Sequence, residues 1–209
     1  MGRLRISYNA PVVLTFALLA VIVEIAWPGA PTGPGVKAEW FTTQGQLGGL
    51  NGYVSLFTHV IGHAGWNHLI ANFMLILLLG PILEERYGSM SLLVMIAITA
   101  VVSGLVDVAL GDRTLGASGI VFMMIVLAST ANIRAGSIPL TFIAIALIYI
   151  GREVASSFDD DNVSQLGHIL GGVCGAAFGF IHARGKHIGP AKPVKTILPG
   201  APVVVRKKP

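Results

Sequence analysis

The stretch WNHLIANFMLILLLGPIL, residues 66–83, is an almost unbroken apolar run with one histidine and two asparagines near its start. Its length is close to the roughly 20 residues that an α-helix needs to cross the hydrocarbon core of a bilayer. His68 and Asn72 are four residues apart and therefore share one face of such a helix. Polar groups are costly inside a membrane, so this face is a candidate functional site.

Five further apolar runs extend on both sides of this one, and together they predict an all-α fold, a polytopic bundle of six transmembrane helices. Only 11% of the residues are charged and 54% are hydrophobic, whereas about a quarter of an ordinary soluble domain is charged. At 209 residues a soluble fold cannot bury that much apolar surface, so lipid is part of the solvent. The second, fourth and fifth runs are short for full crossings. The expected spans are 10–27, 66–83, 91–110, 115–132, 138–154 and 164–182.

We expect residues 1–183 to form one membrane domain, with a long first loop at 28–65 and a basic, disordered tail at 184–209. The loop is rich in Gly and Pro at its start and carries an apolar patch at 54–60, which favours a segment that dips into the membrane interface. The N-terminal run could be a signal peptide. Glu24 and Trp27 occupy the positions where small cleavage-site residues are needed, however, which favours an uncleaved first helix.

The distribution of Lys and Arg predicts the orientation, because cytoplasmic loops carry the excess of these residues. Six spans place three of them outside and eleven on the side of both termini, so we expect a multi-pass protein with cytoplasmic termini. The small size, without a sorting signal or an extra domain, fits a bacterial inner membrane. The net charge of +4 does not indicate a nucleic-acid partner, because the basic residues sit at chain and helix ends. The outer three are Lys37, Arg113 and Arg152; the inner eleven are Arg3, Arg5, Arg86, Arg134, Arg184, Lys186, Lys192, Lys195, Arg206, Lys207 and Lys208.

Polar residues of three different spans are expected at one depth. Ser118 precedes Arg134 by sixteen residues, and His168 precedes Arg184 by the same number. His68 and Asn72 precede the next cytoplasmic arginine by a similar distance. At 1.5 Å per residue these groups lie about 24 Å from the cytoplasmic side, just below the outer surface of the bilayer core.

A serine hydroxyl needs a neighbouring base to act as a nucleophile, and histidine is the usual one. Gly116 and Gly119 flank Ser118 and allow the backbone to turn sharply and approach a substrate. Glycines four residues apart follow on the sixth span, a pattern that lets two membrane helices pack closely. Packing the sixth span on the fourth would bring the imidazole of His168 to the hydroxyl of Ser118. The stripe comprises Gly167, Gly171, Gly175 and Gly179.

Four motifs in this order resemble the rhomboid intramembrane proteases, over residues from about 57 to 180. They are His-x-x-x-Asn at 68–72 with His63 upstream, Glu-x-Arg-x-Gly at 84–88, Gly-x-Ser-Gly at 116–119 and His-x-x-Gly-x-x-x-Gly at 168–175. The resemblance implies a serine endopeptidase that cleaves transmembrane segments of other membrane proteins near their outer ends, without metal or cofactor. By the same resemblance Ser118 is the nucleophile, His168 the general base, and His68, Asn72 and the Ser118 backbone N–H the oxyanion donors.

Two positions depart from the family pattern. The first loop has Val54-Ser55 where many members carry Trp-Arg, and a tyrosine often found one turn after the serine is Phe122. Phenylalanine can still stack on an imidazole but offers no hydroxyl.

Simpler interpretations stand beside these. His59 and His63 are either structural or solvated histidines or part of a water network, Glu84 is expected to pair with Arg86, and Asp107 to be the polar end of its span. Cys174, the one cysteine, is expected to be a small packing residue. The alternatives to a protease are a catalytically silent rhomboid-like protein that binds or escorts membrane clients, and a small transporter, for which the expected internal repeat is missing. The sequence predicts transmembrane substrates and a lipid environment but names neither a particular substrate nor an oligomeric state.

Overall fold

The computed structural model describes residues 8–133, 140, 143–144, 147–148, 151 and 165–183. All regular structure in these residues is helical, which confirms the all-α prediction for the described part of the chain. The fifth predicted span lies largely outside it, and the tail at 184–209 lies wholly outside it. The helices are α1 (Pro11–Ala26), α2 (Val36–Trp40), α3 (Gly49–Thr58), α4 (Trp66–Tyr87), α5 (Ser89–Leu110), α6 (Ser118–Ile133) and α8 (Gln165–Ala183).

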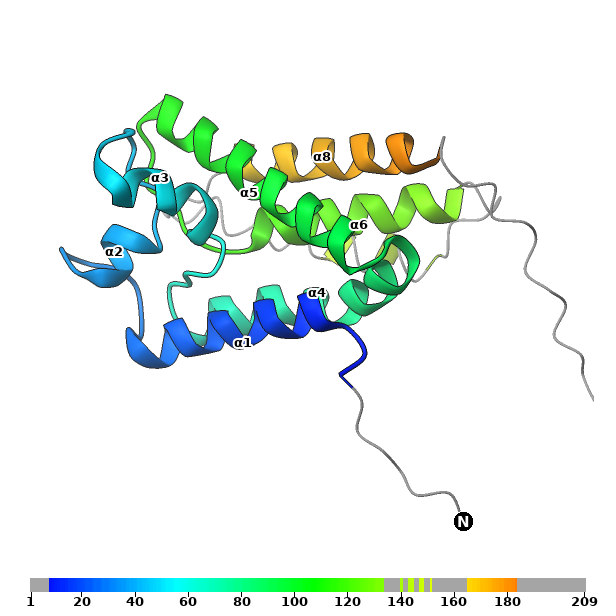
Figure 1. Cartoon of the computed structure of the whole chain (residues 1–209), viewed down its shortest axis with the longest axis horizontal. Coiled ribbons are helices and arrows are strands. Elements are labelled where there is room, and N and C mark those ends of the chain that lie inside the picture. Colours follow the sequence, from blue (N-terminus) through cyan, green and yellow to red (C-terminus); the bar gives the residue numbers. More distant parts are fainter. Residues whose placement is uncertain are drawn as a thin grey trace, which may run out of the picture.

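The long helices form one bundle, with α2 and α3 together at one end of it (Figure 1). Helices α4, α6 and α8 begin near that end, whereas α1 and α5 begin at the other. The most extensive helix contact is between α6 and α8, and α1 packs on α4. The starts of the three helices that carry the predicted site residues therefore lie at the same end of the bundle, as the depth estimate requires.

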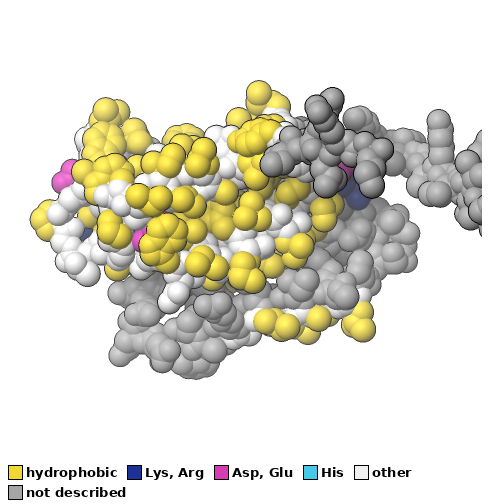
Figure 2. All heavy atoms as spheres, turned by 90° about the horizontal axis from the view of Figure 1, so that it is seen from below, with side chains coloured by type: hydrophobic (Ala, Val, Ile, Leu, Met, Phe, Trp, Pro, Cys, Tyr) yellow, Lys and Arg dark blue, Asp and Glu magenta, His cyan; other side chains and the backbone are white. Residues whose placement is uncertain are grey.

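The bundle exposes apolar side chains to its surroundings over much of its surface, as Figure 2 shows for one face. Exposed examples are Leu78 on α4 and Leu93 on α5. By length and composition α4 and α5 are candidate membrane spans, while α1 and the apolar parts of α6 and α8 are shorter. Two of the predicted spans are thus supported as candidates, and the number six stays a prediction.

The second span is longer than expected: α4 continues past Pro81 and residue 83 to Tyr87 and ends at Gly88, whose φ of +86° favours glycine. In this charged last turn, Glu84 forms hydrogen bonds with α1. Its carboxylate oxygens accept the backbone N–H groups of Val12 and Val13, both at 3.0 Å. A carboxylate at the first turn of α1 satisfies N–H groups that lack helical partners and faces the positive end of the helix dipole. The described contacts of Glu84 are therefore with α1 and not the predicted pair with Arg86.

The first loop is more than a linker, as predicted, since it contains α2 and α3. Leu50, Tyr53 and Phe57 lie on one face of α3 and are more than half exposed. An amphipathic helix with aromatic residues on its apolar face suits the membrane interface. The dip of this loop into the membrane stays a prediction.

Two polar residues are more buried than the sequence suggested. Asp107 is buried, and its carboxylate accepts the hydroxyl of Thr114, so it is not a solvated helix end. His59 is also buried, with Nδ1 donating to the carbonyl of Ser55 at 2.9 Å and Nε2 lying 3.4 Å from the hydroxyl of Ser103. These contacts favour the structural interpretation of His59. Cys174 is a buried free thiol, as its packing role predicts.

Candidate active site

The hydroxyl of Ser118 and the imidazole of His168 meet across the contact between α6 and α8. Ser118 is the first residue of α6, and its Oγ lies 2.8 Å from Nε2 of His168, at hydrogen-bond distance. His168 is 6% exposed, whereas Ser118 is only partly buried. A serine hydroxyl in contact with a shielded imidazole and still partly accessible is the arrangement that nucleophilic catalysis needs.

Glycines allow this approach, because they let the backbones of α6 and α8 touch. A Cβ added to Gly171 would overlap the carbonyl oxygen of Gly119 and lie 2.8 Å from its carbonyl carbon. A Cβ on Gly175 would similarly lie 3.1 Å from the carbonyl carbon of Met123, and a Cβ on Gly119 would lie 3.3 Å from the carbonyl oxygen of Gly167. The glycines singled out in the sequence thus lie in the contact that brings Ser118 and His168 together.

Phe122 supports the imidazole from one side. Its ring stacks on that of His168, with centroids 4.8 Å apart and planes inclined by 16°. Since Phe122 follows Ser118 by four residues on α6, it lies on the same helix face. The phenyl ring therefore retains the stacking that the missing tyrosine would provide.

His68 and Asn72 lie at the start of α4, next to the segment that precedes Ser118. A Cβ added to Gly116, whose φ is +124°, would lie 2.8 Å from Nε2 of His68. The amide of Asn72 donates to the carbonyl of His68 at 2.9 Å, and Asn72 is buried. The ring of His68 thus lies against the serine segment, where only glycine leaves room for it.

Hydrogen bonds from the first loop hold the segment that leads to Ser118. Thr43 and Thr114 form a paired contact, in which the Thr43 N–H donates to the Thr114 carbonyl at 2.9 Å and the Thr114 N–H donates to the Thr43 hydroxyl at 2.7 Å. The N–H of Gly116 donates to the carbonyl of His59 at 2.9 Å. Three backbone groups within four residues of Ser118 therefore form hydrogen bonds with residues 43 and 59.

His63 is fully buried beside His68, with ring centroids 5.1 Å apart. Its Nδ1 lies 3.1 Å from the carbonyl of Ile61, and its Nε2 has no hydrogen-bond partner in the described structure. Burial, together with electrostatic repulsion from His68 and Lys37, lowers the pKa of His63 to about 3. His63 is therefore a neutral, buried histidine and not a solvated one.

One polar cluster was missed by the sequence analysis. Lys37, treated there as a charge of an outer loop, is buried and forms an ion pair with Glu24 of α1 at 2.7 Å. A glutamate inside an apolar span, followed by a single lysine in the next loop, is the signal that could have found it. Within the described residues no group of three or more His, Cys, Asp or Glu side chains is placed to hold a metal ion.

The fold and this site define a class of helical membrane protein in which a serine at the start of one apolar helix meets a histidine of another. The chain matches the family described as "Rhomboid domain" over residues 50–185, and it therefore belongs to the rhomboid family. It is also 35% identical over 138 residues to Rhomboid-related protein 1 of Caenorhabditis elegans, a match that covers 57% of this chain and 37% of that relative. The chain therefore matches little more than a third of the relative's length. Family membership indicates a multi-pass membrane protein, of which α4 and α5 are the candidate spans.

Proposed function

We propose that this protein is an intramembrane serine endopeptidase that cleaves transmembrane segments of other membrane proteins near their outer ends. The observation that carries the proposal is the 2.8 Å contact between Ser118 Oγ and His168 Nε2, with the ring of Phe122 stacked on the imidazole. The four motifs and the family match over residues 50–185 support it.

In the proposed reaction the Ser118 hydroxyl attacks the carbonyl carbon of the scissile peptide bond, and His168 Nε2 takes its proton. The resulting oxyanion accepts hydrogen bonds from the Ser118 backbone N–H and the side chains of His68 and Asn72. The imidazolium then gives its proton to the leaving amine, and an acyl-enzyme remains on Ser118. A water molecule, deprotonated by His168, attacks this ester and releases the second product, after which the imidazolium returns its proton to Ser118.

The partners that we propose are transmembrane protein substrates within a lipid bilayer. The proposed location is a bacterial inner membrane with both termini in the cytoplasm. The excess of Lys and Arg on the side of the termini supports this orientation. In that orientation the end of the bundle with α2 and α3 faces outward, and so do the starts of α4, α6 and α8. Substrates would then be cut near their outer ends.

The test is reaction of the purified full chain in detergent with a fluorophosphonate, which modifies activated serines, together with cleavage of a single-span test protein in liposomes. We expect the wild type to be labelled and to cleave, Ser118→Ala to do neither, and His168→Ala to lose nearly as much as the double variant, because the pair acts as a unit. Ser91→Ala, at the opposite end of the bundle, is the matched control and should behave as the wild type.

A folded wild type that is neither labelled nor able to cleave would contradict the proposal and favour the client-binding alternative. Equal cleavage by the wild type and Ser118→Ala would also contradict it, since the serine would then have no part in the reaction.

A further inference from the structure

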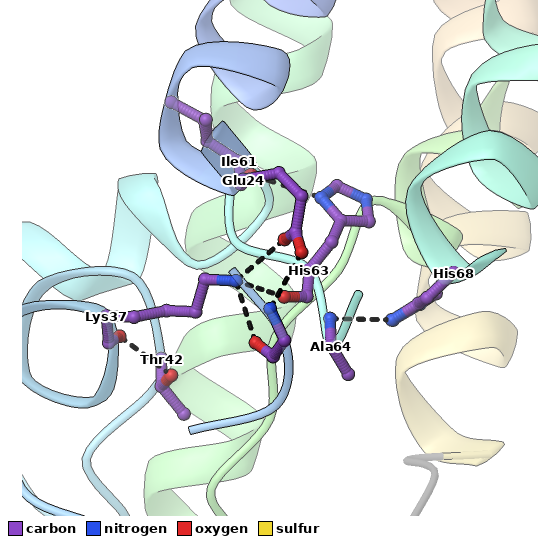
Figure 3. Close-up of polar contacts among 8 residues, drawn as sticks. Glu24, Lys37, Thr42, Ile61, His63, Ala64 and His68 are labelled. Atoms are coloured by element: carbon purple, nitrogen blue, oxygen red, sulfur yellow. Dashed lines mark hydrogen bonds and ion pairs between the residues drawn. The ribbon is translucent and has the colours of Figure 1, made fainter. Parts of the chain in front are cut away.

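Lys37 is a buried cation whose three donors all have acceptors. It is 5% exposed, and its Nζ donates to Glu24 Oε2 at 2.7 Å, to the carbonyl of Gly29 at 2.8 Å and to the carbonyl of His63 at 2.7 Å. Figure 3 shows the ammonium between the Glu24 carboxylate and the His63 carbonyl. An ammonium has three N–H groups, so this set uses all of them. Burying such a charge is costly without these partners.

The bond to His63 ends on one particular peptide unit, the one that joins His63 to Ala64. The oxygen of that unit accepts from Lys37, and the N–H of the same unit donates to Nδ1 of His68 at 3.3 Å (Figure 3). Hydrogen bonds in a chain polarise one another, and a charge at one end strengthens the effect. The ammonium therefore makes the Ala64 N–H a better donor toward the His68 ring.

This donor decides where the proton of His68 lies. A backbone N–H can only donate, so Nδ1 must accept and be unprotonated, and the neutral ring then carries its proton on Nε2. Nε2 lies on the side of the ring that faces Gly116, two residues before Ser118, where an added Cβ would come within 2.8 Å of it. The His68 tautomer that the Ala64 N–H selects is thus the one that presents an N–H to the serine segment.

We propose that Lys37, held by Glu24, is a positioning residue: through the His63–Ala64 peptide it keeps His68 in the tautomer that donates from Nε2 to the oxyanion. The inference rests on the proposed protease function. It differs from a purely structural role, in which the ion pair would only fasten the first loop to α1.

Two single variants separate these roles. Lys37→Met removes the donor to the His63 carbonyl, whereas Glu24→Gln removes the ion pair but leaves the Lys37 amine and its bond to His63. Both variants should lower the melting temperature. Only Lys37→Met should disturb the His68 tautomer.

The readout is the pair of ¹⁵N ring shifts of His68 in the ¹⁵N-histidine-labelled full chain at neutral pH in detergent micelles, assigned by their loss in His68→Gln. We expect Nδ1 unprotonated and Nε2 protonated in the wild type and in Glu24→Gln, and a mixture of both tautomers in Lys37→Met. If Lys37→Met does not fold because Glu24 is left unpaired, the double variant Glu24→Leu/Lys37→Met removes both charges of this ion pair and should give the same mixture.

Three results would overturn the proposal: a wild type with the proton on Nδ1, Lys37-deficient variants with the wild-type tautomer, or Glu24→Gln shifted as far as Lys37→Met. The ring shifts do not depend on catalysis. A wild type that shows the expected tautomer but cleaves nothing would therefore count against the protease function alone.

For a cleaved transmembrane substrate we expect the Lys37-deficient variant to lose about tenfold in kcat with KM nearly unchanged, which is about 1.4 kcal/mol of transition-state stabilisation. This split is expected because an oxyanion donor acts in the transition state and not in substrate binding. A kcat within about twofold of the wild type, despite a shifted tautomer, would separate Lys37 from the reaction.

Discussion

Replacing Gly171 by alanine tests whether the contact between α6 and α8 sets the geometry of Ser118 and His168. The new Cβ would overlap the carbonyl oxygen of Gly119 and lie 2.8 Å from its carbonyl carbon, whereas ordinary contacts begin at 3.4 Å. The two backbones must therefore separate by at least 0.6 Å at this point, and the overlap with the oxygen demands more. Gly119 is the neighbour of Ser118, and Gly171 is one helical turn from His168, so the separation acts directly on the pair.

The consequence can be worked out from the observed contact. A Ser118–His168 distance of 2.8 Å that grows by 0.6 Å reaches 3.4 Å, beyond the usual range for a hydrogen bond to a hydroxyl. Displacements of about 1 Å at a reacting centre can cost roughly a hundredfold in rate. We therefore expect Gly171→Ala to slow fluorophosphonate labelling by between about tenfold and a hundredfold, and to lower the melting temperature.

Gly172→Ala is the matched control, because it lies on the same helix one residue further on. Its added Cβ would meet only Val126 Cγ2 at 3.7 Å, an ordinary contact. Both variants gain the same helix propensity, about 1 kcal/mol for alanine over glycine. Gly172→Ala should thus label at the wild-type rate. Equal labelling rates for the two variants would refute the idea that close packing of α6 and α8 positions the pair.

Two further predictions concern the first loop. Thr43→Val leaves the Thr114 N–H without its acceptor, which should cost about 1–3 kcal/mol of folding stability and speed hydrogen exchange at that amide. Thr43→Ser keeps the hydroxyl and should keep the wild-type stability and exchange rate. Unchanged exchange in the valine variant would show that the contact does not hold the segment before Ser118. Burial keeps His63 neutral in the folded chain down to about pH 3, whereas its pKa in the unfolded chain is the ordinary 6.5. Above about pH 6.5 this difference costs no stability. As the pH drops from there toward 3, protonation of the unfolded chain should lower the free energy of unfolding by roughly 1 kcal/mol per pH unit. Thermal unfolding in micelles measures this slope, which should be shallower in His63→Gln; equal slopes would exclude His63 as its source.

The helical class and much of the site arrangement follow from patterns that are local in the chain. Apolar runs predict helices in a chain surrounded by lipid, and both boundaries of α5 come within two residues of the predicted span. Spacing from the cytoplasmic arginines placed Ser118 and His168 at one depth. Whether they would face one another depended on the glycine contacts between α6 and α8, which spacing can only suggest. The catalytic roles stay predictions until the labelling experiment is done.

The parts that sequence reasoning missed are contacts between segments far apart in the chain. Glu84 was assigned to its neighbour Arg86, but its carboxylate reaches the first turn of α1. Lys37 was counted only as a basic residue on the outer side, but it is buried and donates to Glu24 and to the His63 carbonyl. Such long-range polar contacts produce no periodic pattern in the sequence, because each one joins only two residues.

The polar contacts of the first loop explain how this chain can hold its site without the Trp-Arg pair found in many relatives. Lys37 binds the carbonyl of His63, and the chain continues from there into the start of α4 and His68. Thr43 pairs with Thr114, and the His59 carbonyl accepts from Gly116, so the loop also holds the segment before Ser118 at two of its residues. All three contacts end on backbone groups, whose positions determine where His68 and Ser118 lie. The hydroxyl of Ser55 donates within α3, to the carbonyl of Gly52 at 3.0 Å, so it does not fasten the loop to α4 or to the segment before Ser118. The described contacts therefore fasten the loop to the segments that carry His68 and Ser118 through residues 37, 43 and 59, and not through the side chains at positions 54–55.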